Sequence, residues 1–561
     1  MPSLAPSHSR SWGIKSFHDE IGAMKMRGIL AHLAQSQYVN NQLNENATIV
    51  APSPIYPFLV ALRAKNAPVL LVTSSSRSAE DLASELRDLH SNVLEFPAWE
   101  TLPHEKLSPR SDTVAQRVRT LYALANATKM SVHPIVITPV RGMIHRIIKD
   151  LTDRELVSLE IGQERSLEEL VRHLSDLSYS RTDLVERRGE FAVRGGIVDL
   201  FLPLSNHPIR IDFFGDEIED ISYFEVADQR TFKAVVGPVE IFPCRELLLT
   251  DSIKKRAKDI AEKYPAAQEL LVKISEGMTP EGMESLIPLL VDETSSLLEK
   301  MPKGTQVIYI DFERIKSRAA DLIATNDEFL AASWSNASYG GNVPIHDGAQ
   351  TYMSWEDLAE NVARTGFEIQ SLNPFGNDLD AHTTFLDCTP IDPLRGDIER
   401  AIAELSGALE AGNCVVFATH GHGMVERYAG IFRGADLPVY IVEKLDAIPT
   451  RGSIHLTTTS LTHGFAMSGE NLFIMTERDL TGSKGSIKDG ERLPSKRKQS
   501  IDPLELKAGD FIVHEQHGIG RYIELLERTV AGITREYLVI EYASAKRGQP
   551  GDRIFVPTDS L

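Results

Sequence analysis

The stretch Pro68-Val-Leu-Leu-Val-Thr73 is short and almost wholly apolar, and the segment from Ser75 to Leu89 follows it with apolar residues at helical spacing. Such a run is typical of a strand buried on both faces, and Ser75 suits the capping position of a helix. Pro134-Ile-Val-Ile-Thr-Pro139 repeats the strand pattern, and residues 141–148 follow it as a second expected helix. Strands that alternate with helices predict a parallel sheet, so the chain begins as an α/β protein.

Outward from this unit, the pattern changes at several points along the 561 residues. Short strands broken by Gly and Pro predict an inserted β-rich module, after which Gln306–Asp311 is expected to return to the first sheet. A second α/β unit, a linker rich in Gly, Ser, Lys and Arg, and a final all-β module that suits a small barrel follow. The expected segments are 1–149 and 244–345 for the first α/β domain, 150–243 for the insert, 346–482 for the second α/β domain, 483–501 for the linker and 502–561 for the barrel.

The bulk composition is that of an ordinary globular protein with an acidic balance. The net charge of -20 excludes a surface that is basic throughout, so any contact with nucleic acid is expected to be local. Three distant cysteines (Cys244, Cys388 and Cys414) give neither a disulfide framework nor a metal-ligand spacing. We find no signal peptide and no apolar run long enough to span a bilayer, and therefore expect a cytoplasmic protein without membrane contact.

An arginine-rich block lies inside the insert, from Tyr179 to Phe201, and a second strand-like run follows at Ile209-Arg-Ile-Asp-Phe-Phe-Gly-Asp-Glu-Ile-Glu219. Side chains two apart on a strand share a face, so the sheet can present several guanidinium groups together. The arginines are Arg181, Arg187, Arg188, Arg194 and Arg210. Their display around an exposed phenylalanine favours docking to a partner rich in carboxylates.

The residues needed for nucleotide hydrolysis are missing. No Gly-x-x-x-x-Gly-Lys-Ser/Thr motif occurs, and Val50-Ala-Pro-Ser-Pro-Ile-Tyr-Pro57 stands where the phosphate loop would lie, with proline in place of glycine and no lysine. In Ile310-Asp-Phe-Glu313, Phe312 separates the two carboxylates that would position magnesium. The two histidines of Thr419-His-Gly-His-Gly423 favour a turn over a metal site. We therefore expect no catalytic residue, metal or cofactor in this chain.

Several motifs resemble the bacterial transcription-repair coupling factor family (Mfd). They are spread over nearly the whole chain and include Trp99-Glu-Thr-Leu-Pro103, the Arg181–Phe201 block, Phe213-Phe-Gly-Asp-Glu-Ile-Glu219 and Val513-His-Glu-Gln-His-Gly-Ile-Gly-Arg-Tyr522. The resemblance implies a degenerate helicase-like domain similar to the repair helicase UvrB, an insert that binds the damage-recognition protein UvrA, and a spacer at 346–482. It also implies a Tudor- or SH3-like barrel, similar to CarD-type regulators, that binds the RNA polymerase β subunit.

The resemblance also places candidate binding residues. For UvrA these are Arg181, Arg194, Arg210 and Asp212, with Phe191 as the apolar anchor between them. A solvated sheet face, or pairing of the arginines with Asp183, Glu186 and Glu190, is the structural alternative.

For RNA polymerase, an exposed edge strand of the barrel is expected to pair with the β subunit. The candidates are Tyr537, Leu538, Val539 and Ile540, with Arg521 and Arg535 at the rim. The alternative is that Leu538 and Ile540 belong to the barrel core.

In this family the chain continues into a relay helix and a two-lobed DNA translocase, so the sequence is expected to be an N-terminal portion. ATP, Mg²⁺ and most contacts with double-stranded DNA are then expected in the missing motor. This portion is expected to be a monomeric adaptor that binds stalled RNA polymerase and recruits UvrA to damaged DNA. The alternatives are an active UvrB-like ATPase or helicase, which Pro52, Pro54, Pro57 and Phe312 disfavour, and a stand-alone CarD-like transcription regulator.

Overall fold

The computed structural model describes residues 24–45, 47–101, 107–153, 156–338, 351–376, 382–482, 508–514, 518–530, 533–542 and 552–557. The chain divides into two compact units, Met1–Glu491 and Arg492–Leu561. The linker expected at 483–501 lies outside the described residues. Within them, no helix is both long and apolar enough to cross a membrane.

A seven-stranded parallel sheet forms the centre of the first unit and confirms the α/β prediction. Its strands, in spatial order, are β17 (Thr383–Phe385), β1 (Thr48–Val50), β16 (Glu368–Asn373), β15 (Gln306–Ile310), β2 (Val69–Thr73), β4 (Ile135–Pro139) and β3 (Val93–Glu95). Every pair of neighbours runs parallel, and β15 returns to lie beside β2 as expected. All five residues of β2 are buried, because helices cover both faces.

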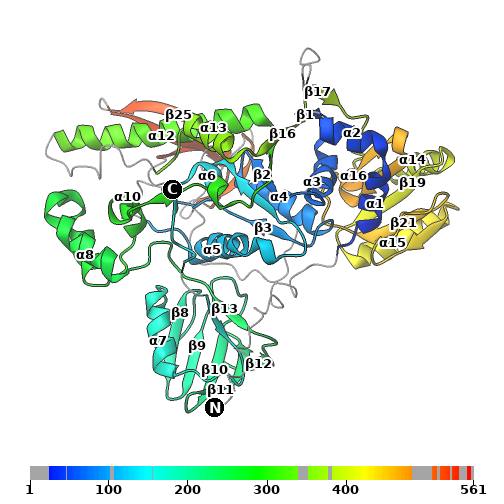
Figure 1. Ribbon diagram of the computed structural model, residues 1–561. Coiled ribbons are helices and arrows are strands. Elements are labelled where there is room, and N and C mark those ends of the chain that lie inside the picture. The colour runs from blue at the N-terminus through cyan, green and yellow to red at the C-terminus, as the bar shows by residue number, and fades with distance from the viewer. Residues whose placement is uncertain are drawn as a thin grey trace, which may run out of the picture. The chain divides into compact units, whose positions relative to one another are not determined.

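Two layers of helices enclose this sheet (Figure 1). One face is covered by α1 (Arg27–Gln35), α2 (Gln37–Glu45), α3 (Tyr56–Ala64) and α4 (Ser76–Arg87), and the other by α5 (Ser111–Ala125), α6 (Val140–Ile144), α12 (Phe312–Ser338) and α13 (Trp355–Thr365). The predicted cap of α4 is present, since the Ser75 hydroxyl accepts a hydrogen bond from the Ser78 amide. Helix α6 is shorter than predicted, because β5 (Ile147–Ile148) pairs with β14 (Thr294–Ser295).

The first sheet extends beyond the boundary expected near residue 346. Strands β16 and β17 both follow that point in the sequence, yet β16 lies between β1 and β15 and β17 pairs with β1. Helix α12 also continues to Ser338, into residues 333–347, a stretch rich in Gly, Asn, Ser and Asp whose composition predicts a domain boundary. The polar composition of that stretch was therefore a poor guide to where the sheet ends.

A second sheet of the first unit begins at β18 and includes the parallel strands of the expected second α/β domain. Its order is β18 (Thr389–Pro390), β22 (Phe465–Met467), β23 (Leu472–Thr476), β19 (Cys414–Thr419), β21 (Ile454–Thr458) and β20 (Val439–Ile441), with α14 (Ile398–Glu410), α15 (His422–Gly434) and α16 (Glu477–Thr481). One apolar core joins this sheet to α1–α4. The rings of Phe58 and Phe465 meet edge to face across it, with centroids 5.3 Å apart.

The insert is a β-rich module, as predicted. Its six-stranded sheet has the order β12 (Thr231–Ala234), β11 (Glu217–Phe224), β10 (Ile209–Phe214), β9 (Ile197–Leu200), β8 (Glu190–Arg194) and β7 (Ser180–Arg181). Helix α7 (Leu167–Asp176) packs on one face through Leu170 and Leu174 (Figure 1). The chain enters and leaves the module through the antiparallel pair β6 (Val157–Leu159) and β13 (Val239–Ile241).

After the insert, the chain forms α8 (Asp251–Ile260), α9 (Gln268–Ser275), α10 (Ile287–Leu290) and α11 (Leu297–Lys300) before it returns to the first sheet at β15. A buried ion pair fixes the start of this segment. Arg117 of α5 donates through Nε to Glu246, and both side chains are only 1% exposed. The same carboxylate accepts from Trp99 Nε1 at 3.0 Å, and the Arg117 guanidinium lies 4.1 Å from the centre of the Phe96 ring.

The second unit is an antiparallel ladder of β24 (Phe511–His514), β25 (Gly518–Val530), β26 (Ile533–Tyr542) and β27 (Asp552–Pro557), in this order. Ile512, Tyr522, Leu538 and Ile540 form its small core. Among the strands that the structure describes, β24 and β27 do not pair, so closure into a barrel remains a prediction.

Replacing Arg117 with Met should leave the Glu246 carboxylate buried without its cation. Breaking a buried pair from one side costs about 3–5 kcal/mol, whereas removing both charges is often close to neutral. We expect Arg117→Met to lower the free energy of unfolding by that amount in urea titrations followed by circular dichroism. Arg117→Met/Glu246→Gln should recover much of the loss, and a double variant no more stable than the single one would contradict this account.

Candidate functional site

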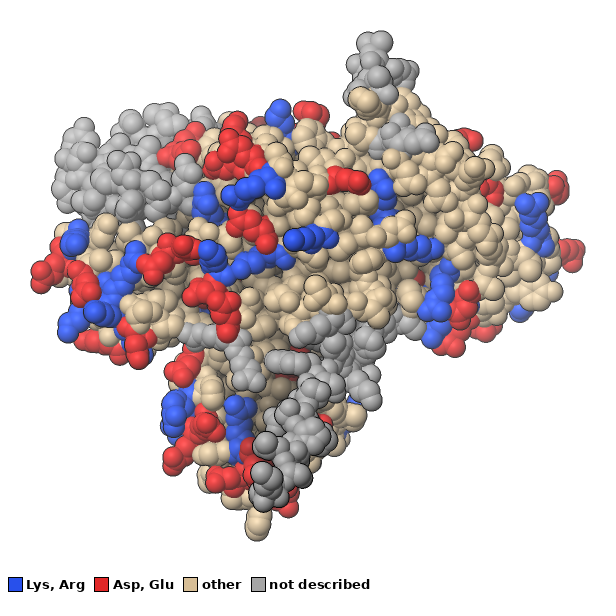
Figure 2. Space-filling model, viewed as in Figure 1, with Lys and Arg blue, Asp and Glu red and all other residues tan. Residues whose placement is uncertain are grey.

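Charges of both signs are mixed over the first unit and its insert. On the face shown in Figure 2, Lys and Arg side chains alternate with Asp and Glu side chains instead of gathering into one broad field. Candidate binding surfaces therefore have to be sought in local groups of side chains.

One such group lies on the face of the insert sheet that is turned away from α7. Phe191, Val198 and Ile211 point into the core beneath α7. Because neighbouring residues on a strand alternate between faces, Asp199 of β9 and Arg210 of β10 point to the opposite side. These two residues are directly opposed in the antiparallel register. We call this side of the sheet the arginine face.

Asp199 holds the centre of the arginine face. Its two oxygens accept from Arg210 Nε at 2.7 Å and Nη2 at 3.0 Å, a bidentate pair, and Arg194 Nη2 lies 3.9 Å away. Asp199 is 2% exposed, Arg210 20% and Arg194 50%. The hydrogen bonds that Arg210 donates to the Asp199 carboxylate raise the pKa of Arg210. Burial raises the pKa of Asp212 beside it, while the Arg210 charge opposes that shift.

Arg181 and Arg194 come together at the edge of the sheet formed by β7 and β8. Both side chains are exposed, and they line a surface hollow of about 530 Å³ with Thr182, Asp183 and Val193. β7 runs parallel to β8, which brings Arg181 beside Phe191 in the register. Arg194 also donates from Nη2 to the Asp183 carbonyl at 3.2 Å. The hollow thus presents two guanidinium groups to solvent.

The sheet of the second unit has two outer strands, β24 and β27, and two inner ones. Phe511 on β24 is 77% exposed. Its register partner Arg521 is exposed as well and donates to Glu541 at 2.7 Å. A strand at a sheet edge has backbone groups free to pair with another chain, so β24 is a candidate docking edge.

The segment between β1 and α3 occupies the position of a phosphate-binding loop. Pro52 and Pro54 have no amide hydrogen, and the amides of Ile55 and Tyr56 are used by the carbonyls of Pro52 and Ser53. The Tyr56 ring is buried, with its hydroxyl donating to the Ala51 carbonyl at 2.9 Å. Burial, together with the charge of Asp311, raises the pKa of Tyr56. Few backbone donors are left here for an anion.

Two family models match the chain over these modules. The UvrB interaction domain matches residues 157–247, which contain the arginine face, and the CarD-like/TRCF RID domain matches residues 506–561, which contain β24–β27. The transcription-repair-coupling factor of Mycobacterium tuberculosis is 38% identical over 95% of this chain and 46% of its own length. Those of Myxococcus xanthus and Staphylococcus aureus are 30% and 25% identical, over 89% and 94% of this chain and 43% and 46% of theirs.

The chain is homologous to the N-terminal portion of transcription-repair coupling factors. It spans less than half the length of the relatives named above. The resemblance noted from the sequence motifs is thereby confirmed for the family, while the contacts made by individual residues remain predictions.

Against this coupling-factor background, one predicted UvrA contact has to be corrected. Phe191 was expected to be an exposed apolar anchor, but its side chain is completely buried beneath α7. Successive side chains on a strand point to opposite faces, so Phe191 points into the core and Ala192 points to the arginine face. Phe214, at the end of β10, is 76% exposed. Phe213 packs against the core, which turns Phe214 to the arginine face.

The other arginines of the block are divided between surface and structure. Arg188 is held by Asp112 at 3.4 Å and the Ser205 carbonyl at 3.0 Å, which ties the module to α5. Glu190 accepts from the amides of Glu186 and Arg187, so it shapes the loop. Arg188 and Arg210 are therefore paired within the molecule, but with Asp112 and Asp199, acids that the alternative did not name, whereas Arg181 and Arg194 remain exposed.

The predicted polymerase-binding strand is also corrected. The candidates Tyr537, Leu538, Val539 and Ile540 lie on β26, which pairs with β25 on one side and β27 on the other. Its backbone groups are therefore used within the sheet, and Leu538, Val539 and Ile540 are buried. Of Arg535 and Tyr537 the structure describes only the backbone, while Arg521 lies at the surface as expected.

Two residues of this surface were not predicted, although the sequence pattern around each of them indicates its position. Asp199 is the one acidic residue in the apolar run Ile197-Val-Asp-Leu-Phe201, and a carboxylate in such a strand requires a buried cation as partner. Phe214 is the second of two adjacent phenylalanines before a glycine turn. Since adjacent strand residues face opposite ways, one of the two had to point outward.

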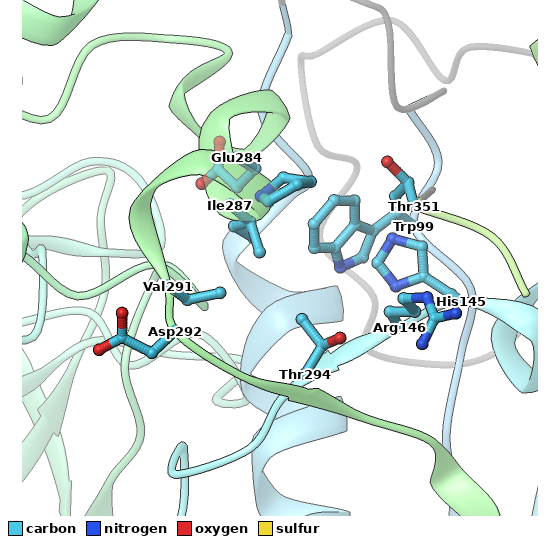
Figure 3. A pocket seen from close by; sticks show the side chains of 10 residues that line it. Trp99, His145, Arg146, Glu284, Ile287, Val291, Asp292, Thr294 and Thr351 are labelled. Carbon is cyan, nitrogen blue, oxygen red and sulfur yellow. The ribbon is translucent and has the colours of Figure 1, made fainter. Parts of the chain in front are cut away.

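A separate cavity of about 230 Å³ lies within the first unit (Figure 3). Trp99 and His145 lie side by side in its wall, with ring centroids 4.2 Å apart, while the carboxylates of Glu284 and Asp292 point away from it. Burial, with the charges of Arg117 and Arg141, lowers the pKa of His145 well below its usual value. The cavity therefore presents an imidazole on an aromatic wall, and its lining includes no residue of the arginine face.

Truncating the two phenylalanines should separate core from surface. Phe191→Ala should lower the free energy of unfolding by about 3–5 kcal/mol, because it leaves a cavity under α7. Phe214→Ala should change it by no more than about 0.5 kcal/mol, as for other exposed positions. Urea unfolding followed by circular dichroism measures both. Equal losses in the two variants would show that the exposure of Phe214 has been misread.

Proposed function

We propose that this chain is the adaptor portion of a factor that couples transcription to nucleotide excision repair. In this proposal, the arginine face recruits UvrA and the β24–β27 module binds the β subunit of stalled RNA polymerase. The observation that carries the proposal is the pair of exposed guanidinium groups, Arg181 and Arg194, within the segment that matches the UvrB interaction domain. The matching CarD-like/TRCF RID domain supports the second partner.

The arginine face suits a protein partner with carboxylates and an apolar pocket. Arg194 and Arg181 can each form a bidentate pair with a carboxylate, and Phe214 supplies a large exposed ring on the Arg194 side of the sheet. Phe214 therefore replaces Phe191 as the proposed apolar anchor. Arg210 and Asp212 contribute through the shape of the face, because Arg210 is already paired with Asp199.

For the polymerase we propose the β24 edge as the docking strand. An incoming strand of the β subunit would add to this edge through backbone hydrogen bonds, with Phe511 as an apolar contact and Arg521 beside it. β26 contributes the core residues that hold β24 and β25 in place. The sheet supports this arrangement because its outer strands, among those described, are β24 and β27.

This portion of the protein is proposed to lack ATP hydrolysis of its own. The prolines and the buried Tyr56 ring leave no cradle for phosphates between β1 and α3, and Phe312 packs against Tyr309 and Trp355 instead of accompanying a carboxylate pair. ATP, Mg²⁺ and the translocation of double-stranded DNA would belong to the remainder of the whole protein. An active UvrB-like ATPase is the rival, and saturable micromolar binding of a fluorescent ATP analogue would favour it.

Charge reversal at the two exposed arginines should weaken binding to UvrA. A hydrogen bond to a charged group contributes about 1.5–3 kcal/mol, so Arg194→Glu and Arg181→Glu should each raise the Kd by roughly 10- to 100-fold. Arg172→Glu is the matched control, because Arg172 is exposed on α7, on the other face of the sheet. Calorimetry with purified UvrA measures all three. Unchanged affinity in both test variants would move the site elsewhere.

The polymerase contact is tested at Phe511. Phe511→Asp should reduce binding to the polymerase β subunit at least about tenfold, because it places a charge on the proposed strand-pairing edge. Phe375→Asp, at another highly exposed phenylalanine in the first unit, is the control and should have no effect. UvrA binding should survive in both. A simultaneous loss of UvrA binding would show that the two modules do not act independently, and a stand-alone CarD-like regulator would not bind UvrA at all.

A further inference from the structure

A buried carboxylate at the centre of the arginine face makes contacts that the proposed docking function does not yet use. Asp199 lies on β9 between β8 and β10, opposite Ala192 on one side and Arg210 on the other. It is 2% exposed, so it cannot meet a partner itself. Both of its oxygens are turned to arginine side chains that rise from the neighbouring strands.

The two arginines around Asp199 are held very differently. Arg210 gives two donors to Asp199 and a third to the Gln229 carbonyl at 3.2 Å, and its guanidinium lies 5.0 Å from the centre of the Phe224 ring. Arg194 approaches the same carboxylate only to 3.9 Å, donates to the Asp183 carbonyl at 3.2 Å and keeps half of its side chain exposed. Arg210 thus satisfies the buried charge, and Arg194 is attracted to it without being drawn inward.

We propose that Asp199 is the positioning residue of the UvrA-docking surface. Asp199 fixes Arg210 flat against the sheet. The attraction of its negative charge also holds the Arg194 guanidinium at the rim of the hollow, oriented for a carboxylate of the partner. The inference rests on the proposed recruitment of UvrA by this face. Its physical basis is that a flexible arginine loses conformational freedom on binding, and a preorganised one loses less. Arg181, outside this arrangement, serves as an internal reference.

The test is a double-mutant cycle on UvrA affinity. Asp199→Asn keeps the shape of the side chain and removes its charge, and we expect it to raise the Kd for UvrA about tenfold or more while the far-ultraviolet circular dichroism spectrum stays unchanged. Asp199→Asn/Arg194→Gln should bind as weakly as the weaker of its two single variants, because the aspartate acts through that arginine. Asp199→Asn/Arg181→Gln should instead show the product of the two losses.

The outcomes separate this inference from the docking proposal. Wild-type affinity in Asp199→Asn, with weak binding in Arg194→Gln and Arg181→Gln, would overturn the positioning role and leave the docking surface intact. Wild-type affinity in all three would overturn both. If Asp199→Asn does not fold, Arg210→Gln provides the second test. It frees the carboxylate to draw Arg194 inward, so a folded Arg210→Gln variant with unchanged affinity would also overturn the inference.

Discussion

The buried pair of Arg117 and Glu246 is the constraint on which the arrangement of the first unit depends. The carboxylate belongs to the chain that leaves the insert, the guanidinium to a helix on the main sheet, and Trp99 donates to the same oxygen. A charge removed from water must find its partner in one geometry or be severely unfavourable. The pair therefore fixes where the insert is attached, and the position of the arginine face follows from that attachment.

The same chemistry recurs inside the insert for a different purpose. Asp199 is as deeply buried as Glu246, but one of its two arginines remains partly in solvent. In the first case the ion pair closes a structure, whereas in the second it supports a surface. The pair around Asp199 thus leaves one arginine at the surface, where we propose that UvrA docks.

The sequence predicted the strands and helices of each layer better than it predicted where the first sheet ends. Apolar strands such as Val69–Thr73 and the Ser75 cap follow from local rules, and they were found where expected. The return of β16 and β17 to the first sheet depends on contacts between residues hundreds of positions apart, which no local pattern reports. At the site, arginine spacing located the face, but the direction of Phe191 and the inner position of β26 depend on register, which periodicity alone leaves undetermined.

The packing of Phe58 against Phe465 has an evolutionary consequence. These rings belong to elements on either side of the expected domain boundary, yet they lie in one hydrophobic core together with Leu71 and Val416. A change of volume on one side has to be matched on the other, because protein interiors are close-packed. Substitutions in the two α/β regions should therefore be correlated in evolution. A chimera that joins the second region of a distant relative to this first region would have a poorly packed interface between them.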